Sequence, residues 1–321
     1  MEITILFSSA GRRNQLLDCF RQDASALGIK IRILAVDLQP ALSPACQQAD
    51  ASFAVPRCTA PEFIPSLIEL CQKESVNLLV PTIDTELAVL SQYAAQFAAV
   101  GTRVVVSSPE VVALAGNKLL TAERLAAAGV PTPRTLGLAE YLRDPARLQS
   151  PVIAKPLCGS ASIGIVRPRD PQDLAGLDPA GYLVQELWQG REFTVNVFFD
   201  KSGRLRCAVP HERLEVRAGE VSKGITRDVP ALTAAAEKLA AALPGAVGPL
   251  CFQAVLAPAG EFAVFEINAR FGGGFPLAHR AGARFSRWLL EESFGLPSSA
   301  TKHWKQGVTM LRYDAAVFQN V

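Results

Sequence analysis

The first hundred residues alternate between short apolar runs and longer segments in which apolar residues recur every three or four positions. Runs such as ITILFSS are typical of buried strands, and segments such as RNQLLDCFRQDASALG are typical of helices that bury one face. This alternation predicts a parallel sheet with helices on both faces. The expected strands are 3–9, 31–38, 77–82 and 102–108, and the expected helices are 13–28, 61–74 and 84–97.

The pattern changes after residue 108. Two short helices are expected first, then a strand, a loop of small residues at 157–164 and a second strand. From residue 182 onward, longer strand-like segments joined by short polar turns favour an antiparallel sheet, interrupted by one helix. The expected helices here are 109–115, 118–128 and 230–242, and the expected strands are 151–156, 182–187, 191–200, 204–216, 250–257 and 261–270.

This order of elements predicts three units. They are an N-terminal α/β domain over 1–108, a small central α+β lobe over 109–185 and a larger C-terminal α+β lobe over 186–321. The chain has 321 residues, of which 49% are hydrophobic and 19% are charged. Each unit can therefore bury a core, and the composition is that of a globular protein rather than a disordered one.

Charge and cysteine usage narrow the function classes. A net charge of +2 gives no large basic field, and no apolar run approaches the roughly 18 residues that span a bilayer. We do not expect the start, MEITILFSSAGRR, to be a signal peptide, because it has an acid at position 2 and passes directly into a predicted strand. Seven scattered cysteines without C-x-x-C favour free thiols in a reducing cytosol. We therefore expect a cytoplasmic protein that binds neither nucleic acid nor membranes.

The segment FEINARFGGGF (265–275) carries an acid, an amide and an arginine at alternate positions. Strand alternation places Glu266, Asn268 and Arg270 on one face and Phe265 on the other. Arg270 can neutralise a phosphoryl group or bind an acyl phosphate. The three glycines that follow are expected to allow a backbone turn close to the reacting groups.

The preceding strand adds a further oxygen donor. A hairpin turn centred within APAG (257–260) pairs Pro258 with Glu261 and sets Gln253 opposite Glu266, on the same face. Oxygen ligands that carry about one negative charge in total suit Mg²⁺ (or Mn²⁺), which keeps waters and borrows phosphate oxygens. The alternative is a solvated strand face whose polar residues have no function.

Other segments suit a nucleotide. Lys155 ends the apolar strand VIAKP and needs an anionic partner, unless it extends to solvent. The loop beyond it contains Ser160 and Ser162, among small residues whose backbone N–H groups can cover phosphates, but it lacks the Walker pattern. In VQELWQGRE, Gln185 and Glu186 end a strand and Glu192 follows a glycine turn, so that backbone and carboxylate can bind adenine and ribose. An ordinary hairpin is the alternative.

Two loops at strand ends in the N-terminal domain suit a small substrate. SSAGRR includes Ser9 and Arg12 between a strand and a helix, where hydroxyls, N–H groups and the guanidinium can bind an anion. In PTIDTE, Asp84 and Glu86 also follow a strand, and can receive a substrate ammonium group. The alternatives are a solvated arginine and an aspartate that caps a helix.

Taken in order, these motifs resemble the ATP-grasp superfamily. The resemblance rests on Lys118, VIAKP, the small glycine and serine loop, QELWQGRE, and Gln253 followed by E-x-N-x-R, and it extends over about residues 1–295. The most similar pattern is that of the synthetase halves of carbamoyl-phosphate synthase large subunits and their stand-alone relatives. The resemblance implies a pre-ATP-grasp domain followed by a two-lobed ATP-grasp fold.

The resemblance also implies a role for each of these positions. A nucleotide would lie between the two lobes, with lysines on its phosphates, a strand end at its adenine and a carboxylate at its ribose. The implied residues are Lys118 and Lys155 for phosphate, Glu186 and Leu187 for adenine, Glu192 for ribose, and Gln253, Glu266 and Asn268 for Mg²⁺.

The reaction implied by the family is activation of a carboxylate by ATP. The γ-phosphate moves to a carboxylate oxygen, and an amine then displaces phosphate from the acyl phosphate. This chemistry needs charge neutralisation and positioning, to which Lys223 can contribute at the γ-phosphate or the substrate carboxylate, unless it belongs to a solvated loop. The expected partners are therefore a small carboxylate and an amine, with a homodimer left open. Release of an acyl or carbamoyl phosphate, and a non-catalytic ATP-binding regulator, are the alternatives.

Overall fold

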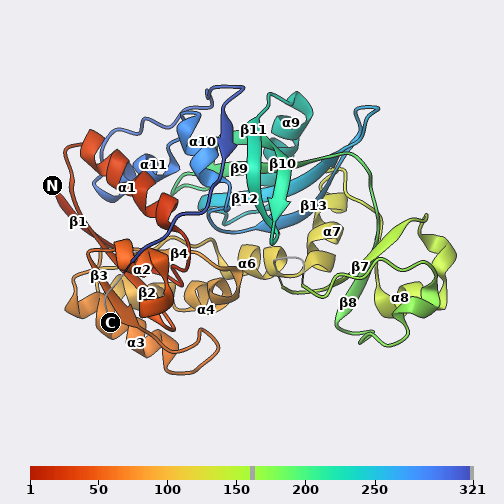
Figure 1. The fold of residues 1–321 in the computed structure, drawn as a ribbon, viewed down its shortest axis with the longest axis horizontal. Helices are drawn as coiled ribbons and strands as arrows, with labels where there is room; N and C mark the ends of the chain where they lie inside the picture. Colours follow the sequence, from red (N-terminus) through yellow and green to blue (C-terminus); the bar gives the residue numbers. More distant parts are fainter. Residues whose placement is uncertain (160–162, 319–321) are drawn as a thin grey trace.

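The computed structural model describes residues 1–159 and 163–318, so the predicted phosphate contacts Ser160 and Ser162 lie outside the described residues. The N-terminal part is a parallel five-stranded sheet in the order β3-β2-β1-β4-β5 (Figure 1). Its strands are β1 (Glu2–Ser8), β2 (Lys30–Asp37), β3 (Ala51–Ala54), β4 (Leu78–Pro81) and β5 (Arg103–Val104). Its helices are α1 (Asn14–Ala26), α2 (Pro44–Gln48), α3 (Phe63–Lys73), α4 (Leu87–Gln92) and α5 (Ala94–Ala99).

The predicted parallel sheet is confirmed, with local differences. The single helix expected over 84–97 is a 3-10 turn (Asp84–Glu86) followed by α4 and α5, which are separated at Tyr93. The strand expected over 102–108 is ladder-paired only at β5, because the chain then turns towards a helix that starts at Pro109. Strand β3 was not predicted, because three of its four residues are partly buried, the fourth is exposed, and the segment lacks a long apolar run.

The large lobe contains a six-stranded sheet in the order β13-β12-β9-β10-β11-β14, in which all neighbours are antiparallel. Its strands are β9 (Arg191–Phe199), β10 (Leu205–Arg217), β11 (Glu220–Thr226), β12 (Gly248–Leu256), β13 (Phe262–Asn268) and β14 (Thr309–Leu311). Its helices are α9 (Pro230–Ala242), α10 (Phe275–Arg280) and α11 (Phe285–Ser293). The predicted antiparallel sheet is therefore present.

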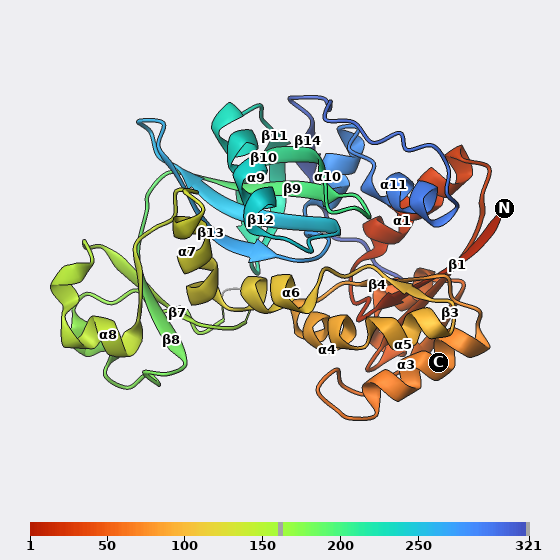
Figure 2. The same cartoon turned by 180° about the vertical axis from the view of Figure 1, so that it is seen from behind.

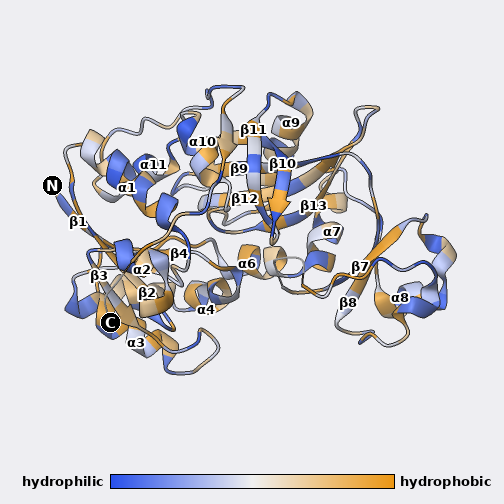
Figure 3. Cartoon of the chain, in the orientation of Figure 1, coloured by the Kyte–Doolittle hydropathy of each residue, from blue (hydrophilic) through white to orange (hydrophobic). Residues whose placement is uncertain are grey.

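The small lobe contains the three-stranded sheet β6-β8-β7, formed by Thr135–Gly137, Tyr182–Glu186 and Val152–Pro156. Helix α8 (Leu138–Arg143) covers it around a core that includes Leu174. Figure 3 shows β7 mainly in the hydrophobic colour, as expected for a buried strand. The second strand expected after the loop is reduced to one isolated bridge, Ala154 to Val166.

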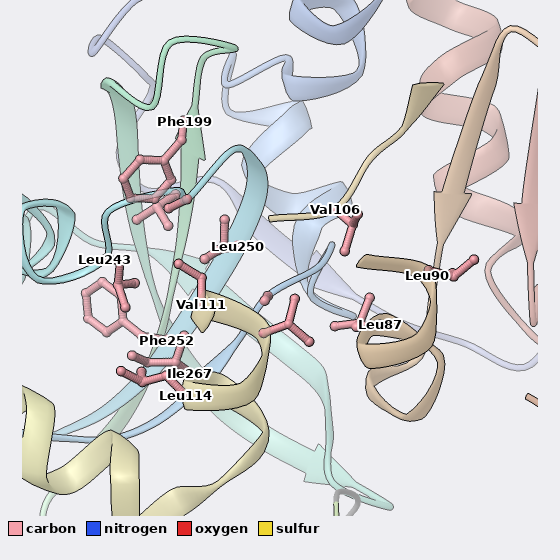
Figure 4. Close-up of a cluster of buried hydrophobic side chains, with 14 of the residues drawn as sticks. Leu87, Leu90, Val106, Val111, Leu114, Phe199, Leu243, Leu250, Phe252 and Ile267 are labelled. Carbon is pink, nitrogen blue, oxygen red and sulfur yellow. The ribbon is translucent and has the colours of Figure 1, made fainter. Parts of the chain in front are cut away.

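Helices α6 (Pro109–Gly116) and α7 (Lys118–Ala127) connect the parts, and both contact β13 of the large lobe. In Figures 1 and 2 the small lobe stands at the opposite end of the molecule from the N-terminal domain, with the large sheet between them. Figure 4 shows one buried cluster that runs from Leu87 of α4 through Val111 of α6 to Phe252 of β12. The N-terminal domain and the large lobe therefore share a core.

A buried acid ties α1 to the C-terminal helices. The Asp23 carboxylate is fully buried and accepts hydrogen bonds from His279 Nε2 at 3.0 Å, from Arg284 Nη1 at 2.7 Å and from Ser286 Oγ. Burial by itself would raise the pKa of Asp23, but the hydrogen bonds from these three donors outweigh it and lower the pKa below its ordinary value of 3.8. The ionised carboxylate therefore stabilises the contact between α1 and the large lobe.

We expect Asp23→Asn to destabilise the fold by about 3 kcal/mol at neutral pH, because three donors lose a buried anionic partner. The folded pKa of Asp23 lies below its unfolded pKa, so this stabilisation is complete above the unfolded value and is lost as pH falls through the folded one. Urea unfolding of both proteins between pH 7 and pH 3 measures the difference. Asp18→Asn is the control, because Asp18 lies on the same helix with its side chain 51% exposed. An equal decrease in the free energy of unfolding for the two variants would contradict the prediction.

Candidate functional site

One cleft of about 790 Å³ lies where the three parts of the chain meet. Its walls come from the loops after β1 and β4, from β7 and β8 of the small lobe, and from β10 to β13 of the large lobe. Twelve of the residues predicted from the sequence line it. They are Arg12, Asp84, Lys118, Lys155, Gln185, Glu186, Leu187, Glu192, Gln253, Glu266, Asn268 and Arg270.

At Gln253 and Glu266, two of the predicted metal ligands, the hairpin of β12 and β13 has the predicted register, although the residues nearer the turn pair differently. Gln253 pairs with Glu266, as expected. Nearer the turn the two strands are shifted by one residue from the prediction. Glu261 was expected to pair with Pro258, but its carbonyl oxygen accepts a hydrogen bond from the N–H of Ala257. A β-bulge then adds Phe265, which consequently lines the cleft. The prediction that Phe265 lies on the opposite, apolar face is therefore wrong.

The side-chain oxygens of three residues of this hairpin, all predicted metal ligands, line the cleft. Gln253 Oε1 accepts a hydrogen bond from Arg213, and Asn268 Oδ1 accepts one from Arg270 at 3.1 Å. Within the described residues, the partly buried carboxylate of Glu266 makes no hydrogen bond or ion pair. A carboxylate that makes no hydrogen bond within the described residues, beside two amide oxygens, fits a hard cation such as Mg²⁺.

A centre built from at least three His, Cys, Asp or Glu ligands is not found in the described part of the chain. The predicted set contains one acid and two amides, so it does not belong to that class of metal site. Arg213, whose side chain is only 6% exposed, was missed from the sequence. The signal was the dense charged run HERLE inside an otherwise apolar strand.

Lys155 extends from β7 into the cleft. Its Nζ donates to Gln185 Oε1 at 2.9 Å and lies 4.8 Å from the centre of the Phe265 ring. Burial lowers the pKa of Lys155 to about 8, and attraction to Glu266 only partly opposes this. A cation held in this way lacks a full counter-charge and suits an anionic ligand such as a phosphate.

The other predicted nucleotide contacts surround Lys155. Lys118 Nζ donates to Gly159 O at 2.7 Å, at the start of the small-residue loop. The Glu186 carboxylate accepts from Gln149 N–H, while Glu192, half exposed, lies 3.8 Å from Arg213.

Leu187 lines the cleft beside Glu186, and its place at adenine stays a prediction. Its N–H donates to Pro151 O at 2.8 Å, so a contact with adenine would not use this N–H. Trp188, which also lines the cleft at this point, was not identified from the sequence.

Arg270 connects the large lobe to the N-terminal domain. Its Nη2 donates to Asp84 Oδ2, its Nη1 donates to Phe271 O, and its buried Nε–H has no partner in the described structure. Asp84 was expected to receive a substrate ammonium group, but in the structure its carboxylate is paired with Arg270. The polar face of β13 therefore extends from Lys155 of the small lobe to Asp84 of the N-terminal domain.

Two predicted substrate residues do not line the cleft. Glu86 is fully buried, and accepts from Ser9 Oγ at 2.8 Å and from Thr82 N–H at 2.9 Å. Burial raises the pKa of Glu86, and these hydrogen bonds oppose the rise. Glu86 and Ser9 therefore hold the two strand-end loops together, and their predicted contact with substrate is wrong because the carboxylate faces inward.

Lys223 also lies outside the cleft lining. Its Nζ forms an ion pair with Glu215 Oε2 at 2.6 Å on the exposed side of the β10–β11 ladder. Arg13, which was not singled out, lines the cleft, with Nη2 3.3 Å from Thr82 O and Nη1 3.3 Å from a carboxylate oxygen of Glu220. The only sequence signal was the second arginine of SSAGRR.

The glycines at 272–274 allow close approach rather than an unusual backbone conformation, since none of them has a positive φ. A Cβ at the first would lie 3.0 Å from Cys251 Sγ, one at the second 2.8 Å from the Glu220 carboxyl carbon, and one at the third 2.6 Å from His211 Nε2. The loop therefore packs its backbone directly onto the side chains that form the cleft wall.

Two family models match the chain. The model of the PylC-like N-terminal domain matches residues 5–105, and the ATP-grasp domain model matches residues 115–274. The chain belongs to the ATP-grasp superfamily, and the predicted fold class, a parallel-sheet domain followed by an ATP-grasp fold, is confirmed. A search of curated proteins gives no match. No helix in the described residues has the length and apolar character to cross a membrane.

Solved structures share this fold at low sequence identity. The biotin carboxylase domain of Hydrogenobacter thermophilus 2-oxoglutarate carboxylase, in complex with MgADP, ADP and bicarbonate, has 16% identity and a TM-score of 0.75, covering 94% of this chain and 72% of that one. Campylobacter jejuni biotin carboxylase has 17% identity and a TM-score of 0.74, covering 94% and 73%. An N5-carboxyaminoimidazole ribonucleotide synthetase with ADP has 19% identity and a TM-score of 0.73, covering 96% and 81%.

Proposed function

We propose that this protein is an ATP- and Mg²⁺-dependent carboxylate–amine ligase that forms ADP. The observation that carries the proposal is the polar face of β13, where Glu266 and Asn268 lie between Lys155 and the Arg270–Asp84 pair. Lys155 of the small lobe and Arg270 of the large lobe, two cations that can bind anions, thereby lie at the two ends of this polar face. This arrangement suits transfer of a phosphoryl group from a nucleotide at one end to a carboxylate at the other.

The chain's own residues would bind and orient the two substrates. Lys118 and Lys155 would bind ATP phosphates, with Gln185 fixing the position of the Lys155 ammonium group by the hydrogen bond at 2.9 Å. Glu186 and Glu192 line the cleft where adenine and ribose would lie. Because Lys155 is buried and only partly compensated, its contact with phosphate would be stronger than that of a surface lysine.

The metal would be held by Gln253, Glu266 and Asn268, and Mg²⁺ (or Mn²⁺) would supply neutralisation of phosphate charge when bound. The two amide oxygens would have to exchange their present arginine donors for the cation. Glu266 needs no such exchange, because its carboxylate has no hydrogen-bond partner among the described residues.

Arg270 is placed to stabilise the reacting anion. Within the described residues its buried Nε–H has no partner, and a buried donor in that state favours an anionic ligand. The acyl phosphate would form at this end of the cleft, beside the glycine loop, and an amine would displace phosphate from it. The proposal does not use Lys223, whose ammonium group is paired with Glu215.

The proposal is tested by measuring ADP and phosphate release from ATP, with a panel of small carboxylic acids and amino acids supplied singly and in pairs. Stimulation that requires both an acid and an amine supports a ligase. Stimulation by an acid alone, with acyl phosphate trapped by hydroxylamine, indicates the acyl-phosphate-releasing alternative. ATP binding by calorimetry without stimulation under any condition indicates a non-catalytic ATP-binding protein and contradicts the proposal.

Arg12 provides a test of substrate binding in the N-terminal domain. Arg12 is exposed and lines the cleft, so we expect Arg12→Ala to lower kcat/KM for the carboxylate about tenfold, as loss of one charged hydrogen bond of ~1.5 kcal/mol does. The KM for ATP should stay constant. Lys30→Ala is the control, because its side chain is 78% exposed. A change in the KM for ATP alone would contradict this assignment.

A further inference from the structure

The substrate end of the cleft contains a carboxylate that the sequence motifs do not include. Glu220, the first residue of β11, lines the cleft with its side chain 40% exposed. Its Oε1 lies 3.3 Å from Arg13 Nη1, and its Oε2 accepts from Arg312 Nη1 at 3.0 Å. Glu220 is therefore held between the N-terminal domain and the segment that follows β14.

Several features of the backbone keep Glu220 in this position. The two residues before it, Ala218 and Gly219, have φ values of 49° and 79°, and a positive φ is unfavourable for alanine. Arg312, which holds one carboxylate oxygen, also donates to Gly273 O. Gly273 lies so close to the carboxylate that it leaves no space for a Cβ. Ala218 and Gly219 form the two-residue turn that joins β10 to β11, where positive φ values are usual, and this turn places Glu220 at the start of β11.

The charges at this end of the cleft are unbalanced. Four arginines, at positions 12, 13, 270 and 312, face two acids, Asp84 and Glu220. Burial would raise the pKa of Glu220, but Arg13 and Arg312 lower it below its usual value, so the carboxylate is ionised at neutral pH. The excess of positive charge favours a substrate that carries a carboxylate, and the partly exposed Glu220 offers one site for a cation beside it.

We propose that Glu220 binds the ammonium group of an amino-acid substrate, with the carboxylate of the same molecule on Arg13, an inference that rests on the ligase function proposed above. Charges of opposite sign then alternate from Arg312 through Glu220 and the ammonium group to the substrate carboxylate and Arg13. Glu220 is a specificity-determining residue, because a substrate without an amino group gives the Glu220 carboxylate no ammonium partner.

The other acids near this end do not fit the role. Glu86 is fully buried with its oxygens directed at Ser9 and Thr82, and the Asp84 carboxylate is paired with Arg270. Glu220 is also paired, with Arg13 and Arg312, but it lines the cleft with the larger exposure, 40% of its side chain against 25% for Asp84. Amine recognition by Glu220 therefore requires no other acid to leave its partner.

The test is the selectivity of ADP release for amino acids over their deaminated analogues, with L-alanine against propionate and L-norleucine against hexanoate as the first pairs of a panel that covers the common amino acids. Wild-type protein should prefer the amino acid in at least one pair by tenfold or more in kcat/KM. Glu220→Gln should reduce that preference at least tenfold and leave the KM for ATP unchanged. Glu237→Gln, on the exposed face of α9, is the matched control.

The outcomes separate this inference from the proposed function. If wild type and Glu220→Gln show the same preference, or if wild type uses deaminated acids equally well, the role of Glu220 is wrong and the ligase function stands. If no acid stimulates ADP release, the ligase function fails and this inference fails with it. If Glu220→Gln does not fold, Arg312→Lys replaces it, with a raised KM for the amino acid at constant KM for ATP expected and an unchanged KM contradicting the role.

Discussion

Glu266→Gln should lower turnover roughly thousandfold, because it removes several kcal/mol of charge stabilisation at the transferring phosphoryl group. Glu266 supplies the one negative charge of the predicted metal site, where its neighbours Gln253 and Asn268 are neutral amides. Its carboxylate has no hydrogen bond or ion pair within the described residues, so the substitution should leave the free energy of unfolding nearly unchanged. ADP release measured over a series of Mg²⁺ concentrations gives the effect.

Glu261→Gln is the matched control for this variant, because Glu261 lies exposed at the turn of the same hairpin. It should have wild-type activity at every Mg²⁺ concentration. Full activity of Glu266→Gln at ordinary Mg²⁺ would exclude Glu266 as a metal ligand. Activity that recovers at high Mg²⁺ would instead support a site that has become weaker but is still used.

Lys155→Met should weaken ATP binding about a hundredfold, equivalent to about 3 kcal/mol for a lost charged hydrogen bond, while stability without nucleotide stays constant or rises. Methionine retains the length of the side chain and removes a charge that burial disfavours. Calorimetric titration with ATP and thermal unfolding without it measure the two effects. Unchanged ATP affinity would assign Lys155 a purely structural role.

The pH dependence of this variant follows from the pKa of Lys155. Burial lowers that pKa from 10.5 to about 8, so between these values the unfolded chain binds more protons than the folded one and stability rises with pH. The stability gained by Lys155→Met should therefore be largest below pH 8 and fade as pH approaches 10.5. Lys73→Met, at an exposed position of α3, is the control and should show no such trend.

The β12–β13 hairpin illustrates how far strand periodicity can predict a site. Alternation along β13 and one assumed turn were sufficient to set Gln253 opposite Glu266, which the structure confirms. The agreement depends on two local departures that cancel, a turn that closes one residue earlier and a bulge at Phe265 that restores the register. A bulge depends on packing against neighbouring segments, in this case beneath Lys155, so it has no signature in the hairpin's own sequence.

The proposed substrate end of the cleft shows where local sequence carries less information. SSAGRR contains two adjacent arginines, and nothing in that segment indicates that Arg13 is the one held by Thr82 and Glu220. Likewise, PTIDTE offers two acids, and only the assembled loops reveal that Glu86 faces inward to bond Ser9.

The sequence by itself determined most of the secondary structure and its order, the ATP-grasp motifs, and the pairing of Gln253 with Glu266. These features are encoded locally, because the spacing of apolar residues reflects which face of each element is buried. Tertiary structure alone decided the pairing of Arg270 with Asp84, 186 residues apart, and of Arg312 with Glu220, 92 residues apart. Such contacts depend on how distant segments pack and on which charges burial leaves without partners, and no short stretch of sequence contains that information.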